Sequence, residues 1–315
     1  RYLQAFSNIM AKSKRHHFVP QFLMRYFTNE KGKLYVYDKL EDSFFESNTE
    51  NLFLEKDRNT FKNLEGVDDD IVEKFYTQFD TYFSSILKEL NTHKKIDSRI
   101  TKSLISLAYI SKWRVRQYDE SFNRAKEYFS VDDLGLGLKN ENGERIDIDL
   151  ESIFDTEMHQ ELKRILLAIQ PIRFKDDFNK IYNNTFFLNT NVPSFISDCP
   201  FNEIPLENEV IFEDFIFPIF TDLTLIHSNR VDLKKIQNFI KSGKEENVQN
   251  FLNDFSYARD ISMLELCERN VACSNLEYLK HIVKNFKTVK QKGMTIPINI
   301  TVFNVLYHYE EYASR

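Results

Sequence analysis

The fold class is decided by residues 68–90, which read DDDIVEKFYTQFDTYFSSILKEL. The stretch opens on three aspartates, and negative charge stabilises the N-terminus of a helix. Its apolar residues then recur at intervals of three and four, namely Val72, Phe75, Tyr76, Phe79, Phe83, Ile86, Leu87 and Leu90. This spacing predicts an amphipathic helix with one face directed at a core. No other helix of the chain is as well defined by its pattern.

Helical spacing returns on both sides of this stretch. A second long helix is expected from about 97 to 129, and further helices are expected at about 19–27, 150–169, 174–182, 233–241, 245–269 and 276–286. Residues 131–148 hold three of the seven glycines together with many charges. We therefore expect them to form a surface excursion.

Short β-prone runs lie between and beside these helices. A hairpin is predicted at 34–37 and 44–45, and strands are predicted at 185–188, 194–197, 210–212, 215–220, 223–227 and, as an extended end, 296–305. Together they indicate an α+β fold, mainly helical, with a small antiparallel sheet from the central and edge strands. Residues 10–315 are interpreted as a single domain. Residues 1–9 are interpreted as a tail or a remnant of an expression vector.

Composition narrows the class of protein. The 315 residues include 29 phenylalanines and 15 tyrosines but only three cysteines, which cannot form a complete disulfide framework. No apolar run reaches the roughly 18 residues that a transmembrane helix needs. Glycine-rich phosphate loops, G-x-S-x-G and H-E-x-x-H motifs are absent from the sequence. We expect a reduced, cytoplasmic protein without a membrane partner.

The net charge of −6 is unevenly distributed. Residues 1–40 carry eight lysines and arginines against two acidic residues, so the rest of the chain is strongly acidic. A basic segment on an acidic body either meets an anionic partner or forms a short solvated tail. Charge alone does not decide between these two interpretations.

The first candidate for chemistry is residues 15–25, RHHFVPQFLMR. Adjacent histidines cannot both face one site, so one of the pair is expected to point away. Pro20 suits a helix start, which would put His17 near the cap and place Gln21 and Arg25 on one helical face. A histidine, an amide and a guanidinium at a helix N-terminus can bind phosphate. The alternative is that His17 caps and packs while His16 is solvated.

The second candidate is residues 193–200, PSFISDCP. An apolar strand running into Ser197 and Asp198 projects a hydroxyl and a carboxylate at the end of the strand, where binding residues are common. The alternative is a turn in which Asp198 only satisfies nearby backbone N–H groups. Nothing indicates a lowered pKa for Cys199, so we interpret it as structural.

Taken together, these segments resemble a large family of bacterial and phage proteins classed as a domain of unknown function. The family opens with H-x-V-P-Q-x-x-L and later carries F-I-x-S-D-x-P. Met24 stands where the family has Leu, and Ile196 runs into Ser197 without an intervening residue. The positions that correspond to family motif residues are His17, Pro20, Gln21, Arg114, Ser197, Asp198 and Pro200. The resemblance implies no activity, but it implies that both motifs belong to one site.

Other segments add candidate substrate contacts. Along residues 68–90 a polar stripe is formed by Glu73, Thr77, Asp80 and Ser84, which is either part of a site or a solvated face. Basic residues surround Trp113 in a pattern that can bind phosphate and stack a base, or that surrounds a core tryptophan. The candidate substrate-binding residues are Arg25, Lys112, Arg116, Lys280, Lys284 and Lys287.

These residues favour a phosphodiester-cleaving enzyme, a nuclease of a bacterial defence or toxin type, with nucleic acid as its partner. The expected catalytic residues are His17, Gln21, Arg114, Ser197 and Asp198. His17 would act either as general acid/base or, with Asp198 and Asp80 or Glu55, as a ligand of magnesium or manganese. The alternative is a non-enzymatic nucleic-acid or protein binding module in which the motif residues are structural. The sequence indicates no oligomeric state.

Overall fold

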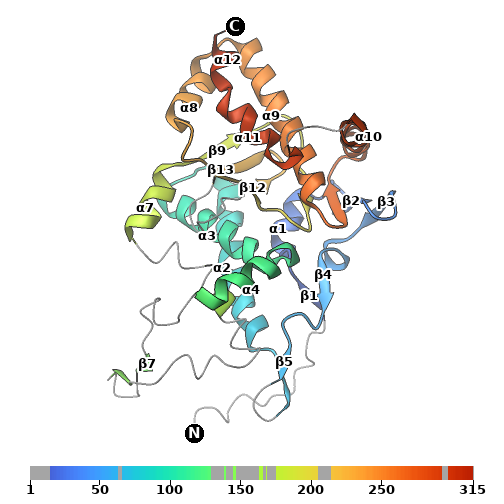
Figure 1. Ribbon diagram of the computed structural model, residues 1–315, viewed down its shortest axis with the longest axis vertical. Helices are drawn as coiled ribbons and strands as arrows, with labels where there is room; N and C mark the ends of the chain where they lie inside the picture. The colour runs from blue at the N-terminus through green and yellow to red at the C-terminus, as the bar shows by residue number, and fades with distance from the viewer. Residues whose placement is uncertain are drawn as a thin grey trace.

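The computed structural model describes residues 15–62, 66–128, 138–139, 145–146, 163–165, 168, 175–204, 214–292 and 297–314. Within these residues the chain is mainly helical and carries small antiparallel sheets, which confirms the α+β prediction. Figure 1 shows the C-terminal helices at one end of the long axis, a sheet that includes β9, β12 and β13 next to them, and the helices α2 (Ile71–His93) and α3 (Ser98–Arg114) beyond that sheet. The helices therefore cover both faces of the sheet.

The best-defined helix of the sequence is α2, Ile71–His93. Its apolar face, including Val72, Phe83 and Leu87, is buried in the largest core cluster. The predicted second helix, 97–129, is broken in two. Helix α3, Ser98–Arg114, ends where Val115 adopts an extended conformation, and α4, Asp119–Tyr128, follows a turn of 3-10 helix.

The central sheet has the strand order β11-β12-β13-β9, with every pair antiparallel. Its strands are Asn202–Glu203, Phe215–Phe220, Leu223–His227 and Thr185–Asn189. Every residue of β12 and β13 is buried. Alternate residues explain this: Phe215 and Phe217 join the cluster formed with α2 and α3, whereas Ile216 joins the cluster of the C-terminal helices. Burial on both faces accounts for the continuous apolar run in the sequence.

A second antiparallel sheet brings together segments from opposite ends of the chain, in the order β10-β14-β2-β3. Its strands are Ile196–Ser197, Asn270–Cys273, Leu34–Asp38 and Ser43–Ser47. The hairpin β2–β3 confirms the sequence prediction, but β14 was not predicted, because four residues are too few to show a period. Strand β14 pairs with both β2 and β10 and lies between them, so it holds residues 196–197 in the same sheet as residues 34–38.

The C-terminal part of the chain is helical. Its helices are α8, Leu233–Ser242, α9, Glu245–Leu266, α10, Leu276–Lys292, α11, Thr301–Tyr307, and α12, Tyr309–Ala313. The extended end predicted at 296–305 is wrong, because a 3-10 turn and then α11 occupy its described part. Val302, Phe303 and Leu306 are fully buried against α9 and the central sheet, so helical packing outweighs their β propensity.

The remaining elements are short. They are β1, Arg15–His17, α1, Gln21–Met24, β4, Leu54–Lys56, β5, Phe61–Lys62, β6, Asp68–Asp69, β7, Leu138–Lys139, β8, Arg145–Ile146, and α7, Lys175–Asn183. The expected surface excursion is described only at the paired strands β7 and β8, and the predicted helix 150–169 and strand 210–212 fall largely outside the described residues.

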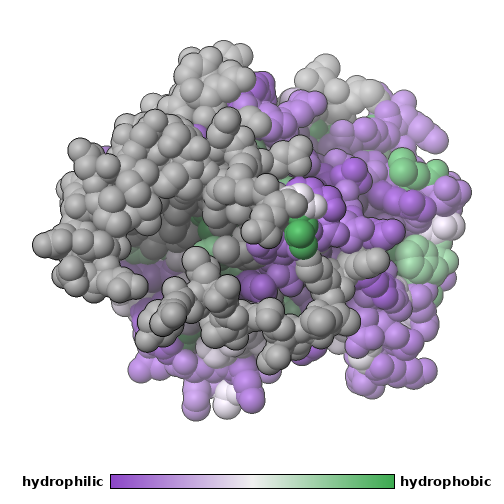
Figure 2. Space-filling model, turned by 90° about the horizontal axis from the view of Figure 1, so that it is seen from below, coloured by the Kyte–Doolittle hydropathy of each residue, from purple (hydrophilic) through white to green (hydrophobic). Residues whose placement is uncertain are grey.

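The described surface is mainly hydrophilic. Seen from below, apolar groups form small separate patches among polar ones (Figure 2). Among the described helices, none has the length and apolar character needed to cross a bilayer.

Candidate functional site

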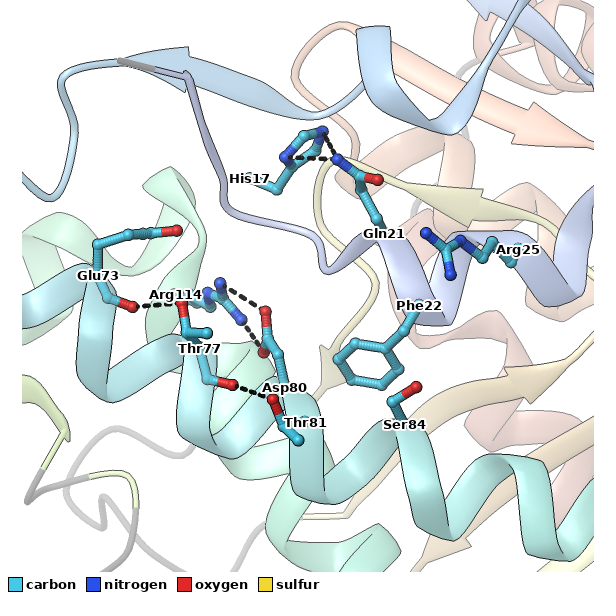
Figure 3. A pocket seen from close by; sticks show the side chains of 10 residues that line it. All are labelled: His17, Gln21, Phe22, Arg25, Glu73, Thr77, Asp80, Thr81, Ser84 and Arg114. Atoms are coloured by element: carbon cyan, nitrogen blue, oxygen red, sulfur yellow. Dashed lines mark hydrogen bonds and ion pairs between the residues drawn. The ribbon is translucent and has the colours of Figure 1, made fainter. Parts of the chain in front are cut away.

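The first sequence motif lies at a pocket of about 330 Å³ between the N-terminal segment and α2. We call it pocket 1. It is lined by His17, Gln21, Phe22, Arg25, Glu73, Thr77, Asp80, Thr81, Ser84 and Arg114. Figure 3 shows the first four residues on one side and the α2 residues on the other. The polar stripe predicted along 68–90 is thus a pocket wall, because all four of its members line the cavity.

The two adjacent histidines have different roles. They lie in strand β1, so their side chains point to opposite sides. His16 is fully buried, and its Nδ1 accepts a hydrogen bond of 2.8 Å from the backbone N–H of Asn59. His17 faces pocket 1. The expectation that His17 lies at a helix cap is wrong, because the N-cap of α1 is Pro20, and His16 is not solvated.

The His17 ring contacts the backbone of Thr49 and the side chain of Gln21. Its ring hydrogen-bonds to the backbone of Thr49, and the Gln21 amide nitrogen lies 3.3 Å from both ring nitrogens (Figure 3). Burial lowers the pKa of His17 below 6.5, and the positive charges of Arg114 and Arg15 act in the same direction, while the Thr49 bond and Glu73 oppose them. A lowered pKa leaves the imidazole neutral at neutral pH, which suits a proton acceptor.

Arg114 forms part of the pocket wall as an ion pair. Its two terminal nitrogens donate to the two carboxylate oxygens of Asp80 at 2.6 and 3.1 Å, and the guanidinium stacks 4.3 Å from the Tyr76 ring centroid. The arginine side chain is 3% exposed and the aspartate 28% exposed. The Nε atom of Arg114 is buried and has no hydrogen-bond partner among the described residues. Arg114 therefore contributes positive charge to the pocket but is already neutralised by Asp80.

Arg25 supplies a more accessible cation. It follows α1 in the chain, its residue is exposed, and no ion pair to it is found among the described residues. Figure 3 shows its guanidinium turned back toward Gln21 at the pocket. Pocket 1 thus combines a neutral imidazole, an amide and an exposed guanidinium. This is the combination that the sequence predicted around His17 for binding a phosphate.

In the second motif, residues 193–200, the polar side chains of Ser197 and Asp198 bond to nearby backbone groups. Ser197 is fully buried, and its Oγ accepts a hydrogen bond from the Cys199 N–H at 3.1 Å, which closes a turn. Asp198 is 6% exposed and accepts backbone N–H groups from residues 268, 269 and 270 at 2.8 to 3.0 Å. Burial raises the pKa of Asp198, while these three bonds oppose the rise. Burial also raises the pKa of the Cys199 thiol far above its usual range.

The two motifs do not share a pocket. Asp198 lines a second cavity of about 310 Å³, which we call pocket 2, and His17 does not line it. The expectation of one composite site is therefore wrong in its geometry. Strand β14 explains the difference, because its pairing with β10 ties Asp198 to residues 268–270 instead of to α2.

The proposed metal ligands are divided in the same way. Asp80 lies with His17 at pocket 1, whereas Glu55 lies with Asp198 at pocket 2. Among the described residues no group of three or more His, Cys, Asp or Glu side chains is arranged to hold a metal ion.

Several predicted substrate contacts have other partners. Lys112 is buried, pairs with Glu203 at 2.6 Å and lies over the Trp113 ring, so it is a core residue and its predicted role is wrong. Arg116 is 55% exposed and lines pocket 2. On α10, Lys280 pairs with Glu277 at 3.0 Å, Lys287 pairs with Asp42, and Lys284 is exposed. The positive charge of these three lysines on α10 is thus partly neutralised by neighbouring carboxylates.

The sequence did not point to some residues that shape pocket 1. The Thr49 backbone orients His17, and Phe22 and Thr81 line the cavity. Thr49 could not be found from the sequence, because a backbone contact leaves no residue-type signal. Thr81 lies one position after Asp80 and could have been added to the stripe on α2.

The fold and the two pockets define an α+β protein in the part of the chain that the structure describes. The family model that matches is DUF4238, a protein of unknown function, and it covers residues 15–257 of this chain. The chain is therefore a member of the DUF4238 family, which confirms the resemblance to a domain of unknown function. Strand β14, which completes the second sheet, lies beyond the matched residues. No curated protein and no solved structure matches the chain significantly.

Proposed function

We propose that the protein cleaves phosphodiester bonds in nucleic acid at pocket 1, with His17 as the general acid/base. The observation that carries the proposal is the placement of a half-buried imidazole with a lowered pKa beside the exposed guanidinium of Arg25. A neutral imidazole accepts a proton from an attacking hydroxyl, and an arginine binds the phosphate that is attacked. A bacterial defence or toxin nuclease is the kind of enzyme that such a site fits.

The chemistry uses the groups of the pocket in a defined order. His17 takes the proton of an attacking hydroxyl as that oxygen forms a bond to phosphorus. The bond from phosphorus to the leaving oxygen breaks, and the imidazolium returns its proton to that oxygen. Arg25 neutralises charge on the phosphate, Gln21 steadies the imidazole ring, and the Thr49 bond fixes the ring orientation. Arg114 supports this arrangement from the wall through its bond to Asp80.

A specific observation favours a second function, a non-enzymatic binding module. Ser197, Asp198 and Lys112 all form buried contacts within the protein. In that case these residues stabilise the fold and take no part in a reaction. Both functions allow nucleic-acid binding, and only the first requires His17 for a chemical change.

The test is incubation of the purified protein with labelled RNA and labelled DNA, in magnesium, in manganese and in chelator. His17→Ala should lower the cleavage rate by about 10²- to 10⁴-fold, the range expected when a general acid/base is removed. His93→Ala, which changes an exposed histidine at the end of α2, is the matched control and should keep the wild-type rate. The rate should rise with pH through a value below 6.5 and then level off, because only neutral His17 accepts a proton.

Two results would remove the nuclease proposal. One is the absence of product on every substrate under every condition, and the other is product whose rate is equal in His17→Ala and the wild type. Binding of nucleic acid without cleavage would favour the binding module. Circular dichroism of each variant distinguishes loss of the site from loss of the fold.

A further inference from the structure

The two walls of pocket 1 offer different hydrogen-bonding groups. One wall is the N-terminal segment, where the Gln21 amide nitrogen and the Arg25 guanidinium are donors beside the His17 ring (Figure 3). A guanidinium carries several N–H groups and no acceptor, so it binds the anionic part of a ligand. The phosphate of a substrate therefore belongs at this wall.

Helix α2 forms the opposite wall and offers acceptors. The Thr77 hydroxyl donates its hydrogen to the backbone carbonyl of Glu73 at 2.9 Å, and the Thr81 hydroxyl donates to the carbonyl of Thr77 at 2.8 Å (Figure 3). A hydroxyl has a single hydrogen, so only the oxygen lone pairs of these two threonines remain for a ligand. The ionised carboxylate of Glu73 likewise only accepts hydrogen bonds. A ligand group that lies beside Glu73 and Thr77 must therefore donate them.

Glu73 is available to a ligand in a way that Asp80 is not. Both carboxylate oxygens of Asp80 accept hydrogen bonds from Arg114, whereas no ion pair to Glu73 is found among the described residues. The Oε2 atom of Glu73 accepts one hydrogen bond of 2.7 Å from the amide nitrogen of Asn59. An ionised carboxylate has about four lone-pair positions, so Glu73 keeps acceptor capacity at the pocket.

Asn59 holds the Glu73 carboxylate relative to the histidine segment. The asparagine is 4% exposed, its backbone N–H donates to His16 Nδ1 at 2.8 Å, and its side chain donates to Glu73. His16 directly precedes His17 in strand β1, so Asn59 links the strand that carries His17 to helix α2. This link keeps the Glu73 carboxylate on the wall across the pocket from His17.

The chemistry of nucleic acids limits which donor can meet Glu73. Pocket 1 has a volume of about 330 Å³, so a donor that reaches Glu73 must lie close to the phosphate bound at the opposite wall. The donor closest to a phosphodiester is the 2′-hydroxyl of ribose, because its carbon is bonded to the carbon that carries the 3′-oxygen. The amino groups of the bases lie farther away, and DNA lacks the 2′-hydroxyl.

We propose that pocket 1 selects RNA over DNA, with the Glu73 carboxylate accepting a hydrogen bond from a ribose 2′-hydroxyl and Asn59 positioning that carboxylate. This selection rests on the proposed function, which places the phosphate of a nucleic acid at Arg25. Acidic side chains accept ribose hydroxyls in the same way in dinucleotide-binding folds. Glu73 recognises the sugar, and His17 still takes the proton of the attacking hydroxyl.

The test compares three labelled single-stranded octamers of one sequence, with ribose, 2′-fluoro or deoxyribose sugars, by fluorescence anisotropy. A 2′-fluoro sugar keeps a conformation close to that of ribose but donates no hydrogen bond, so the ratio of the 2′-fluoro to the ribose dissociation constant measures the donor. The full chain with His17→Ala is used, which keeps the RNA intact. We expect a ratio of at least about tenfold, the effect of one hydrogen bond to a charged group. The wild type with the 2′-fluoro and deoxyribose octamers controls for the His17 substitution.

Variants in this background identify the acceptor. Glu73→Ala should bring the ratio to about one, and alanine preserves the helix propensity of α2. Removal of a negative charge alone would strengthen the binding of all three octamers equally and leave the ratio unchanged. Asn59→Leu should also lower the ratio, although its backbone N–H can still bond to His16. Glu89→Ala changes a glutamate of the same helix outside pocket 1, so it is the matched control and should keep the ratio.

The outcomes separate RNA selection from the nuclease proposal. Equal affinities for the ribose and 2′-fluoro octamers, or a ratio that persists in Glu73→Ala, would overturn RNA selection by Glu73 even if His17-dependent cleavage is found. Absence of binding of every octamer at about 0.1 mM protein, the weak end of non-specific nucleic-acid binding, would overturn it as well. A ribose preference that disappears in Glu73→Ala would support it even if the wild type cleaves no substrate.

Discussion

In the described part of the chain, the arginine–aspartate pairs Arg259–Asp260 and Arg114–Asp80 both have a buried arginine, but their surroundings differ. In the core, Asp260 accepts two bonds from Arg259 at 2.8 and 3.0 Å and a third from the Tyr278 hydroxyl at 2.7 Å. At pocket 1, Arg114 is equally buried, but its partner Asp80 is 28% exposed and its Nε is unpaired among the described residues. The same residue types therefore act as a core cross-link in one place and as a pocket wall in the other.

The comparison extends to two histidines. His227 lies in the central sheet, fully buried, and burial lowers its pKa to about 4. His17 is only half-buried, and burial lowers its pKa as well. The difference shows that burial, not residue type, decides how strongly the charged form of a histidine is disfavoured.

The largest expected effect comes from breaking the core pair. Asp260→Ala should lower the free energy of unfolding by about 3–5 kcal/mol, because Arg259 would remain buried without its counter-charge. Chemical denaturation measures the change. Asp80→Ala is the matched control and should cost about half as much, because water in pocket 1 can solvate the Arg114 guanidinium once the carboxylate is removed. Equal destabilisation of the two variants would show that the pairs do not differ in this way.

A smaller effect is expected from pH. The unfolded chain protonates His227 at pH 6.5, but the folded protein does so only at about pH 4. Between these values the unfolded state binds the extra proton, so stability falls as the pH decreases. The total decrease is about 3 kcal/mol. His227→Leu should flatten the slope of stability against pH in this window.

The control for the pH prediction is His308→Ala, which changes a histidine that is 65% exposed and should keep the wild-type slope. If His227→Leu loses stability on acidification as steeply as the wild type, other groups cause the slope. Thermal unfolding between pH 7 and pH 4 provides the measurement.

The smallest effect is expected on α10, where the charges lie on the surface. Replacing Lys280, Lys284 and Lys287 by Gln should change stability by less than about 0.5 kcal/mol, since exposed ion pairs contribute little. If these lysines bind nucleic acid, affinity should fall and the slope of its salt dependence should flatten by about 0.7–0.9 for each phosphate that is no longer neutralised. Unchanged affinity and slope would identify a solvated face.

Much of the fold follows from local pattern. Helix α2, the hairpin β2–β3 and the strands β12 and β13 were predicted because their apolar residues recur with a clear period or form a clear run. The break at Val115 was not predicted, because the apolar spacing continues across it. Helix α11 was predicted as extended, because its Val and Phe residues favour strands. In the folded protein their packing against α9 outweighs this preference.

Residue spacing was enough to identify many of the polar side chains that line pocket 1. His17, Gln21, Arg25 and the stripe on α2 were identified in this way, and all of them line pocket 1. Which groups meet depends instead on long-range contacts. Strand β14 draws Asp198 to residues 268–270 and away from His17, and the backbone of Thr49 orients the imidazole. The physical reason is that residues far apart in the chain are brought together by strand pairing and burial, which no local period records.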